Sequence, residues 1–159
     1  MLTTQEAQAI NALIVADPAL SSQPQTSDGA YDIAVALNTP SEAGYKPITV
    51  GSAMLWAAGG PRVRIQEAAT DTQQPEAVRA SCQVFLDLIV SGSEALIHTE
   101  EQAILQAFSG WVVTGVITQA EYDAVYGQPS GLAAAILSRS VVAIGRDVSY
   151  QDVLQARVI

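Results

Sequence analysis

The sequence has a single cysteine and a single histidine among 159 residues, and this scarcity excludes several kinds of site. One cysteine, Cys82, cannot build a disulfide framework or a cysteine-based zinc site within one chain. Its apolar neighbours predict a small buried side chain instead. Because Cys82 and His98 are the only thiol and imidazole ligands, we expect neither a tightly bound metal nor a cofactor.

Basic residues are also scarce. The formal net charge is −9, with one lysine, Lys46, and six arginines. A phosphate-binding face needs clustered Lys and Arg, and only Arg62 and Arg64 lie close together in the sequence. We therefore expect no direct binding to nucleic acid and none to an anionic membrane surface.

Long apolar runs and charged residues of either sign are few. No stretch reaches the ~20 apolar residues of a membrane span, and the opening MLTTQEAQAI does not resemble a signal peptide. These features predict a protein made and used in the cytoplasm, or in a particle assembled there. Charged residues make up 14% of the chain, against about 25% in an average soluble domain. A surface so poor in charge suits burial against other copies or partners, or it reflects an alanine-rich proteome.

Helical signals dominate the residues that are present. The length fits one domain, and we expect residues 1–159 to form an all-α domain, a compact bundle of about seven to nine short helices with a central helical hairpin. Four capping-box patterns mark expected helix starts. They pair Thr3 with Glu6, Thr99 with Gln102, Thr118 with Glu121, and Ser149 with Asp152.

The central hairpin is expected over residues 98–127. Four apolar residues share one face of its first helix, Gly115 ends that helix, and the short turn to Thr118 predicts antiparallel packing. These four are Ile104, Phe108, Trp111 and Val112. The core helix that packs on the hairpin is expected over residues 75–91. Its apolar stripe is Val78, Cys82, Phe85, Leu86 and Ile89.

Other segments are less clear. We expect polar loops over 18–27 and 39–47, a left-handed stop at Asn38, and a helix capped near Thr49, although residues 48–50 also suit a strand. The last expected helix before the C-terminal one is a weak alanine-rich helix over 131–140, followed by a short extended piece over 141–145. The inward residues of the helix after Thr49 are expected to be Val50, Met54 and Ala57.

Catalytic motifs are missing. There is no G-x-S-x-G elbow, P-loop or dinucleotide-binding fingerprint. His98 could serve a small hydrolase as general base, but nothing in the sequence places a serine beside it. The acidic pair Asp28 and Asp32 suits a helix N-terminus better than acid–base chemistry. We predict that the protein is not an enzyme.

Two uncharged stretches are the best candidates for subunit contacts, residues 48–61 and 128–138. Trp111 is expected in the core, whereas Trp56 suits the core and an interface equally well. The run from Gly59 to Arg62 is interpreted as a structural break, with anion binding at the following helix as the alternative. The interface candidates are Trp56, Gly59, Gly60, Arg62, Leu132 and Ile136.

Five short motifs resemble a group of small proteins encoded by tailed bacteriophages, over most of residues 28–157. They are Asp28-Gly29-Ala30, Trp56-Ala57-Ala58, Leu86-Asp87-Leu88, the W-V-x-x-G-x-I-T run from Trp111 to Thr118, and the closing D-V-x-x-A-R run from Asp152 to Arg157. The chain departs from the group at Ser138-Arg139-Ser140-Val141, where many relatives have S-R-A-E, so the Arg–Glu pairing expected there lacks its acid.

The resemblance implies a virion or assembly role rather than an enzyme. The favoured hypothesis is a structural component of the virion, in the neck, tail or capsid-associated layer. Its partners would be other phage structural proteins and copies of itself in a homo-oligomer, located in the virion. The alternative is an assembly chaperone for a tail or fibre protein that is not retained in the particle.

Overall fold

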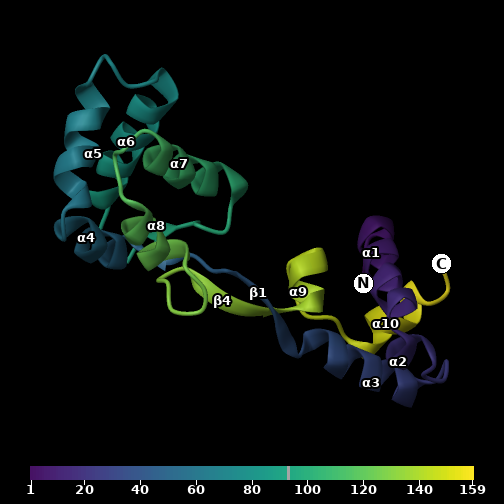
Figure 1. The fold of residues 1–159 in the computed structure, drawn as a ribbon. Helices are drawn as coiled ribbons and strands as arrows, with labels where there is room; N and C mark the ends of the chain where they lie inside the picture. The colour runs from purple at the N-terminus through teal and green to yellow at the C-terminus, as the bar shows by residue number, and fades with distance from the viewer. Residues whose placement is uncertain (93) are drawn as a thin grey trace. The chain divides into compact units, whose positions relative to one another are not determined.

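The computed structural model describes residues 1–92 and 94–159 and is mostly helical (Figure 1). Helices account for 60% of the chain, and the described residues contain ten of them, one more than the upper number expected. The strictly all-α prediction is wrong, because four short strands among the described residues form two two-stranded sheets. The sequence also predicts a connector over residues 93–97, and its first residue, Ser93, lies outside the described residues.

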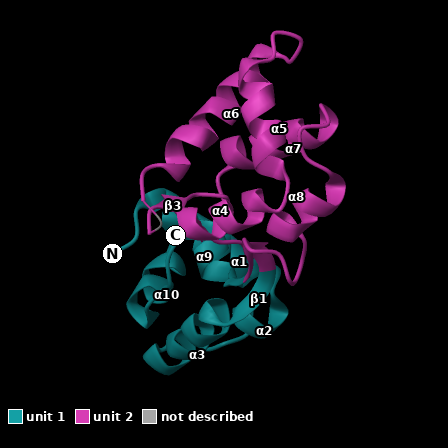
Figure 2. Ribbon diagram, turned by 90° about the vertical axis from the view of Figure 1, so that its left-hand side faces the viewer, with its two compact units in different colours: residues 1–42, 136–159 teal, residues 43–135 magenta. Residues whose placement is uncertain are grey.

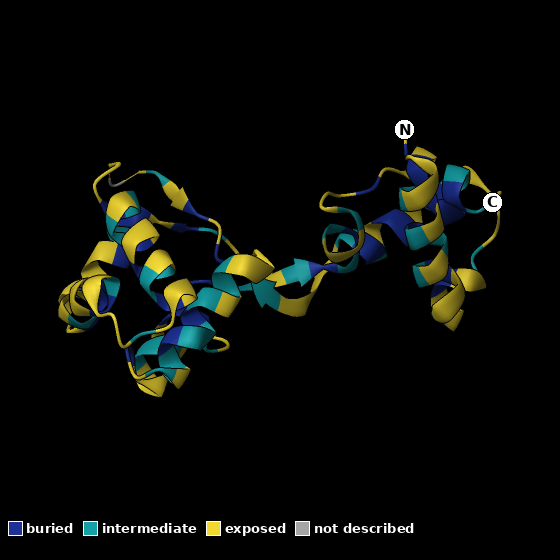
Figure 3. Ribbon diagram, turned by 90° about the horizontal axis from the view of Figure 1, so that it is seen from above, coloured by how far each residue is buried: buried dark blue, intermediate teal, exposed yellow. Residues whose placement is uncertain are grey.

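The chain divides into two compact units, shown in different colours in Figure 2. Unit 1 comprises residues 1–42 and 136–159, and unit 2 comprises residues 43–135. Each unit has its own cluster of buried residues (Figure 3). The single-domain prediction stays a prediction, which unfolding experiments can test.

Unit 1 contains five helices among the described residues. They are α1 (Thr4–Ala16), α2 (Pro18–Ser21), α3 (Ser27–Asn38), α9 (Arg139–Ile144) and α10 (Tyr150–Ala156). The capping boxes of Thr3 with Glu6 and of Ser149 with Asp152 are confirmed. The expected loop over 18–27 instead begins with α2, because the Asp17 carboxylate accepts a hydrogen bond from Ala19 N and Pro18 suits the first helical position.

Two polar contacts tie distant parts of unit 1 together. Arg139, whose expected acidic partner is missing from its own segment, pairs with Asp17 at 2.9 Å. Asn38 is the last residue of α3, so its prediction as a left-handed stop is wrong. Its side-chain amide donates to Val148 O at 2.8 Å and accepts from Val148 N at 2.9 Å, which anchors the segment before α10 to α3.

Unit 2 contains the helices α4 (Val50–Ala58), α5 (Pro61–Thr70), α6 (Glu76–Ile89), α7 (Gln102–Val113) and α8 (Gln119–Tyr126). Strand β2 (Ile48–Thr49) pairs antiparallel with β3 (Leu96–Ile97). The core stripe of α6 is confirmed, since four of its five members are buried and Leu86 is partly buried. The hairpin is also confirmed, because α7 and α8 pack together and Gly115 takes a φ of 79° just after α7.

The capping box predicted for Thr99 is wrong. Thr99 is fully buried, and its hydroxyl donates to Lys46 O at 2.7 Å. Its carbonyl accepts a hydrogen bond from the Tyr126 hydroxyl at 3.0 Å. Helix α7 begins two residues later than expected, after Glu101, without a side-chain cap. The Thr99 hydroxyl is therefore paired with a backbone carbonyl from a distant part of the chain instead of capping α7.

The second sheet overturns three local predictions. Strand β1 (Pro40–Tyr45) replaces most of the expected loop over 39–47, and β4 (Ala134–Ser138), which pairs with β1, replaces the expected alanine-rich helix. The helix comes directly afterwards, where an extended piece was expected, because Ser138 caps α9 through a hydrogen bond from Val141 N at 3.2 Å.

Candidate interaction surfaces

Helix α4 presents an uncharged outer face. Thr49 caps it by accepting a hydrogen bond from Ser52 N at 3.1 Å, as predicted. Val50, Ala53 and Ala57 form its buried side. Met54, expected to point inward, is exposed, and Leu55 beside it is 80% exposed. With no charged residue between positions 48 and 61, this face offers apolar side chains and no charge–charge repulsion.

Trp56 lies one position further on, and its side chain faces the interior of unit 2. The indole ring lies 5.6 Å from the Phe108 ring and 6.2 Å from the Phe85 ring. Its Nε1 donates to Glu121 O at 2.9 Å, which joins α4 to α8. On the outer face of α4, therefore, Leu55 rather than Trp56 is the large side chain available to a partner.

Glu121 also holds the turn between α4 and α5. Its carboxylate accepts Thr118 N at 2.8 Å in the confirmed capping box and accepts Arg64 Nη2 at 2.6 Å. Burial raises the pKa of Glu121, but the hydrogen bonds from Thr118 and Arg64 outweigh this effect and the pKa is lowered. Gly60 has a φ of 143° in this turn, which side-chain-bearing residues rarely adopt. Of the exposed candidates, Gly59 and Gly60 therefore lie in this turn, and Arg62 lies in the first turn of α5.

Leu132 of unit 2 and Ile136 of unit 1 are both exposed. Leu132 N donates to Ala124 O at 3.0 Å, which fixes Leu132 against the end of α8. Ile136 lies in the middle of β4 rather than on a helix.

The groups considered for chemistry are dispersed. His98 is more than half exposed, and within the described residues its side chain has one hydrogen-bond partner, Glu100 at 2.9 Å. Helix α3 is capped by Thr26, and Asp28 lies in its first turn, as expected for an acid near a helix N-terminus. In the described part of the chain, no three His, Cys, Asp or Glu side chains cluster as metal ligands would. Over the same residues, no helix has both the length and the apolar character needed to cross a bilayer.

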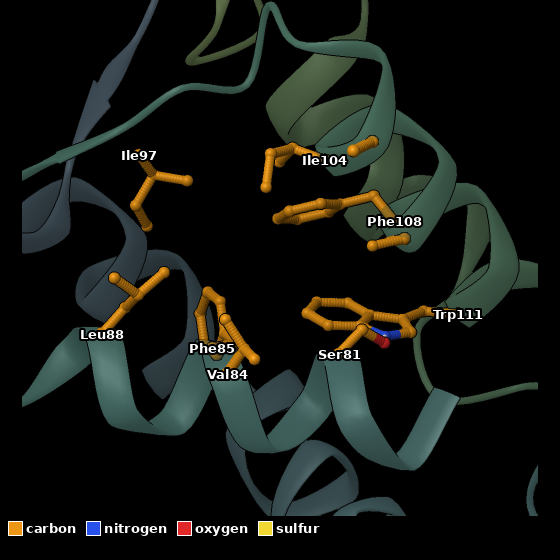
Figure 4. Close-up of a pocket in the computed structure, with 10 residues that line it drawn as sticks. Ser81, Val84, Phe85, Leu88, Ile97, Ile104, Phe108 and Trp111 are labelled. Carbon is orange, nitrogen blue, oxygen red and sulfur yellow. The ribbon is translucent and has the colours of Figure 1, made fainter. Parts of the chain in front are cut away.

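A groove lies between α6 and α7 that was not predicted from the sequence. A hollow of about 210 Å³ opens between them, and an adjoining hollow of about 300 Å³ shares Ser81, Ala103 and Ala107 with it. In Figure 4, Val84, Phe85 and Leu88 of α6 lie opposite Ile104, Phe108 and Trp111 of α7, with Ile97 near one end. The available signal was the spacing of small residues, Ala77 and Ser81 on one helix and Ala103, Ala107 and Gly110 on the other.

Comparisons of the chain with models of known protein families, with curated proteins and with solved structures gave no match.

Proposed function

We propose that this protein is a structural component of a tailed-bacteriophage particle and acts through contacts between subunits. The observation that carries the proposal is the outer face of α4, where Leu55 is 80% exposed within a run of 14 residues that has no charge. The proposed location is the neck, tail or capsid-associated layer of a virion, because the sequence motifs resemble those of small tailed-phage proteins. The partners are copies of the chain and other structural proteins.

The physics of α4 favours a contact role. Burying a leucine side chain contributes about 1.5–3 kcal/mol, and a ring or shell repeats that gain at each subunit. The uncharged face also avoids the cost of burying an unpaired charge. The rest of the molecule carries a net charge of −9, which opposes random association of free copies in solution. Assembly would then depend on the outer face of α4 rather than on nonspecific association.

The test is an inventory of purified particles by mass spectrometry, made with wild-type protein and two variants. Leu55→Glu places a charge on the proposed contact. Val113→Glu makes the same kind of change on α7, where Val113 is 87% exposed. We expect the wild type and Val113→Glu at fixed stoichiometry in the particle and Leu55→Glu to be depleted. If the wild-type chain is absent from particles, or if Leu55→Glu is incorporated fully, the proposal fails.

The second candidate is an assembly chaperone that leaves before the particle is finished. The groove between α6 and α7 favours it, because an apolar groove on an acidic protein suits a temporary client. A chaperone would be found with its client in infected cells and would be missing from finished particles. The same inventory therefore separates the two candidates.

A further inference from the structure

The groove between α6 and α7 has the chemistry of a protein-binding site rather than a metabolite site. Apart from Ser81 and Gln106, its lining side chains are apolar. The Ser81 hydroxyl accepts from Trp111 Nε1 at 2.9 Å and donates to Val78 O at 2.9 Å. Since this hydroxyl is already paired, a small polar ligand would find little to orient it. An apolar side chain needs no hydrogen-bond partner, so it can fill the groove without an unpaired polar group.

The size of the groove suits side chains presented in a row. Its two hollows, of about 210 and 300 Å³, are each far larger than the ~30 Å³ that a water molecule occupies in the liquid. The lining residues of α7 run from Ala103 to Trp111, roughly 12 Å at 1.5 Å per residue. A partner helix places residues i, i+4 and i+7 along a similar length of one face.

The charged residues in the same part of the sequence favour a basic partner. Residues 77–111, which include all the lining residues, contain four acidic residues and one basic residue, Arg79. All four acids are exposed, with one on α6 and three between α6 and α7. They are Asp87, Glu94, Glu100 and Glu101. A second copy of this chain would bring its own charge of −9 to this acidic region, whereas a basic partner would be attracted.

We propose that the groove binds an amphipathic helix of another protein, with apolar residues at i, i+4 and i+7 and lysine or arginine on its flanks. The apolar side chains would fill the two hollows, and the basic side chains would lie near the exposed acids. This mode needs no free strand edge and leaves the backbone of both helices paired. It adds a partner surface that the proposed contact at α4 does not provide.

The test uses a synthetic helical peptide with leucines at i, i+4 and i+7 and lysines at the other positions. Nuclear magnetic resonance of the labelled full-length protein locates the binding site, and fluorescence anisotropy gives the affinity. We expect chemical-shift changes at Ala103, Ala107 and Ile104, and affinity that falls as salt is raised. A peptide with glutamate in place of lysine should bind at least about tenfold more weakly, a difference of 1.4 kcal/mol.

Two matched valines provide the variants. Val84 lines the groove and is 55% exposed, while Val63 on α5 is 59% exposed and does not line it. Because both side chains already face solvent, their replacement by glutamate should preserve the fold, which circular dichroism checks. We expect Val84→Glu to weaken peptide binding at least about tenfold and Val63→Glu to leave it unchanged.

Other outcomes overturn the proposal. It fails if the lysine peptide causes no shifts in the groove, if its shifts map to α4 instead, or if the glutamate peptide binds equally well. It also fails if Val84→Glu changes the oligomeric state measured by sedimentation, because the groove would then be covered by a second copy. Loss of Leu55→Glu from particles bears only on the proposed structural function, so the two proposals fail independently.

Discussion

Replacing Phe85 by alanine should destabilise unit 2 strongly. Phe85 is 4% exposed, and its ring lies 5.6 Å from Trp111, 6.2 Å from Trp56 and 6.5 Å from Phe108. Truncation of a buried phenylalanine costs about 3–5 kcal/mol of unfolding free energy, and each lost aromatic pair contributes about 0.5–1.5 kcal/mol beyond burial. Because Phe85 also lines the groove, the new cavity opens toward solvent and relaxes more easily. We therefore expect a loss near 3 kcal/mol.

The distribution of tryptophan makes the measurement specific to one unit. Both tryptophans, Trp56 and Trp111, belong to unit 2, and the unit 1 sequence has none. Urea unfolding followed by tryptophan fluorescence thus reports on unit 2, while circular dichroism reports on the helices of both units. Val84→Ala, at the neighbouring exposed position, is the control and should change stability by no more than about 0.5 kcal/mol.

The comparison of the two signals also tests the single-domain prediction. If the units unfold together, fluorescence and circular dichroism give one transition, and Phe85→Ala shifts both equally. If they unfold separately, part of the circular dichroism transition stays in place. A loss below about 1 kcal/mol in the fluorescence transition would contradict the assignment of Phe85 to the core.

Three further predictions concern single residues. Gly60→Ala should cost about 1–3 kcal/mol because φ is 143° there, whereas Gly59→Ala, at an ordinary φ of −74°, should be tolerated; urea midpoints of the pair measure this, and equal midpoints would contradict it. Burial raises the pKa of the Cys82 thiol to about 11, so a thiol reagent should modify it only when urea unfolds the protein, and rapid native modification would show that Cys82 is accessible. Burial raises the pKa of Asp152, but hydrogen bonds from Ser149 and Arg146 lower it by more. The folded-state pKa therefore lies below the ordinary 3.8. The stability from Asp152 is therefore present above pH 3.8 and lost as pH falls through the lower folded value; Asp152→Asn should flatten this acid limb in urea titrations, and an unchanged limb would refute the assignment.

The helices that pair a capping residue with an apolar stripe could be predicted from the sequence. In α1, α8 and α10 the cap and the buried side agree, so local and tertiary preferences lead to the same structure. The segment over 131–145 failed because alanine has high helix propensity wherever it occurs. Ala134 and Ala135 became strand because β4 pairs with β1, and that pairing joins residues far apart in the sequence. Tertiary pairing then outweighed local propensity.

The residues that form the candidate surfaces could not be predicted from the sequence either. Leu55 and Trp56 are neighbours in an uncharged run, and from the sequence Trp56 suits the core and an interface equally well. A step of one residue turns the side chain by about 100° around a helix, so only one of the two can face the core. The hydrogen bond from Trp56 to Glu121 determines which one, and Glu121 lies 65 positions away.

The groove likewise depends on contacts between distant parts of the sequence, because the small residues of α6 and those of α7 form a hollow only where the two helices pack against each other. Each proposed surface therefore depends on how helices pack, and it can be tested through substitutions that change one surface while leaving the other intact, such as Leu55→Glu and Val84→Glu.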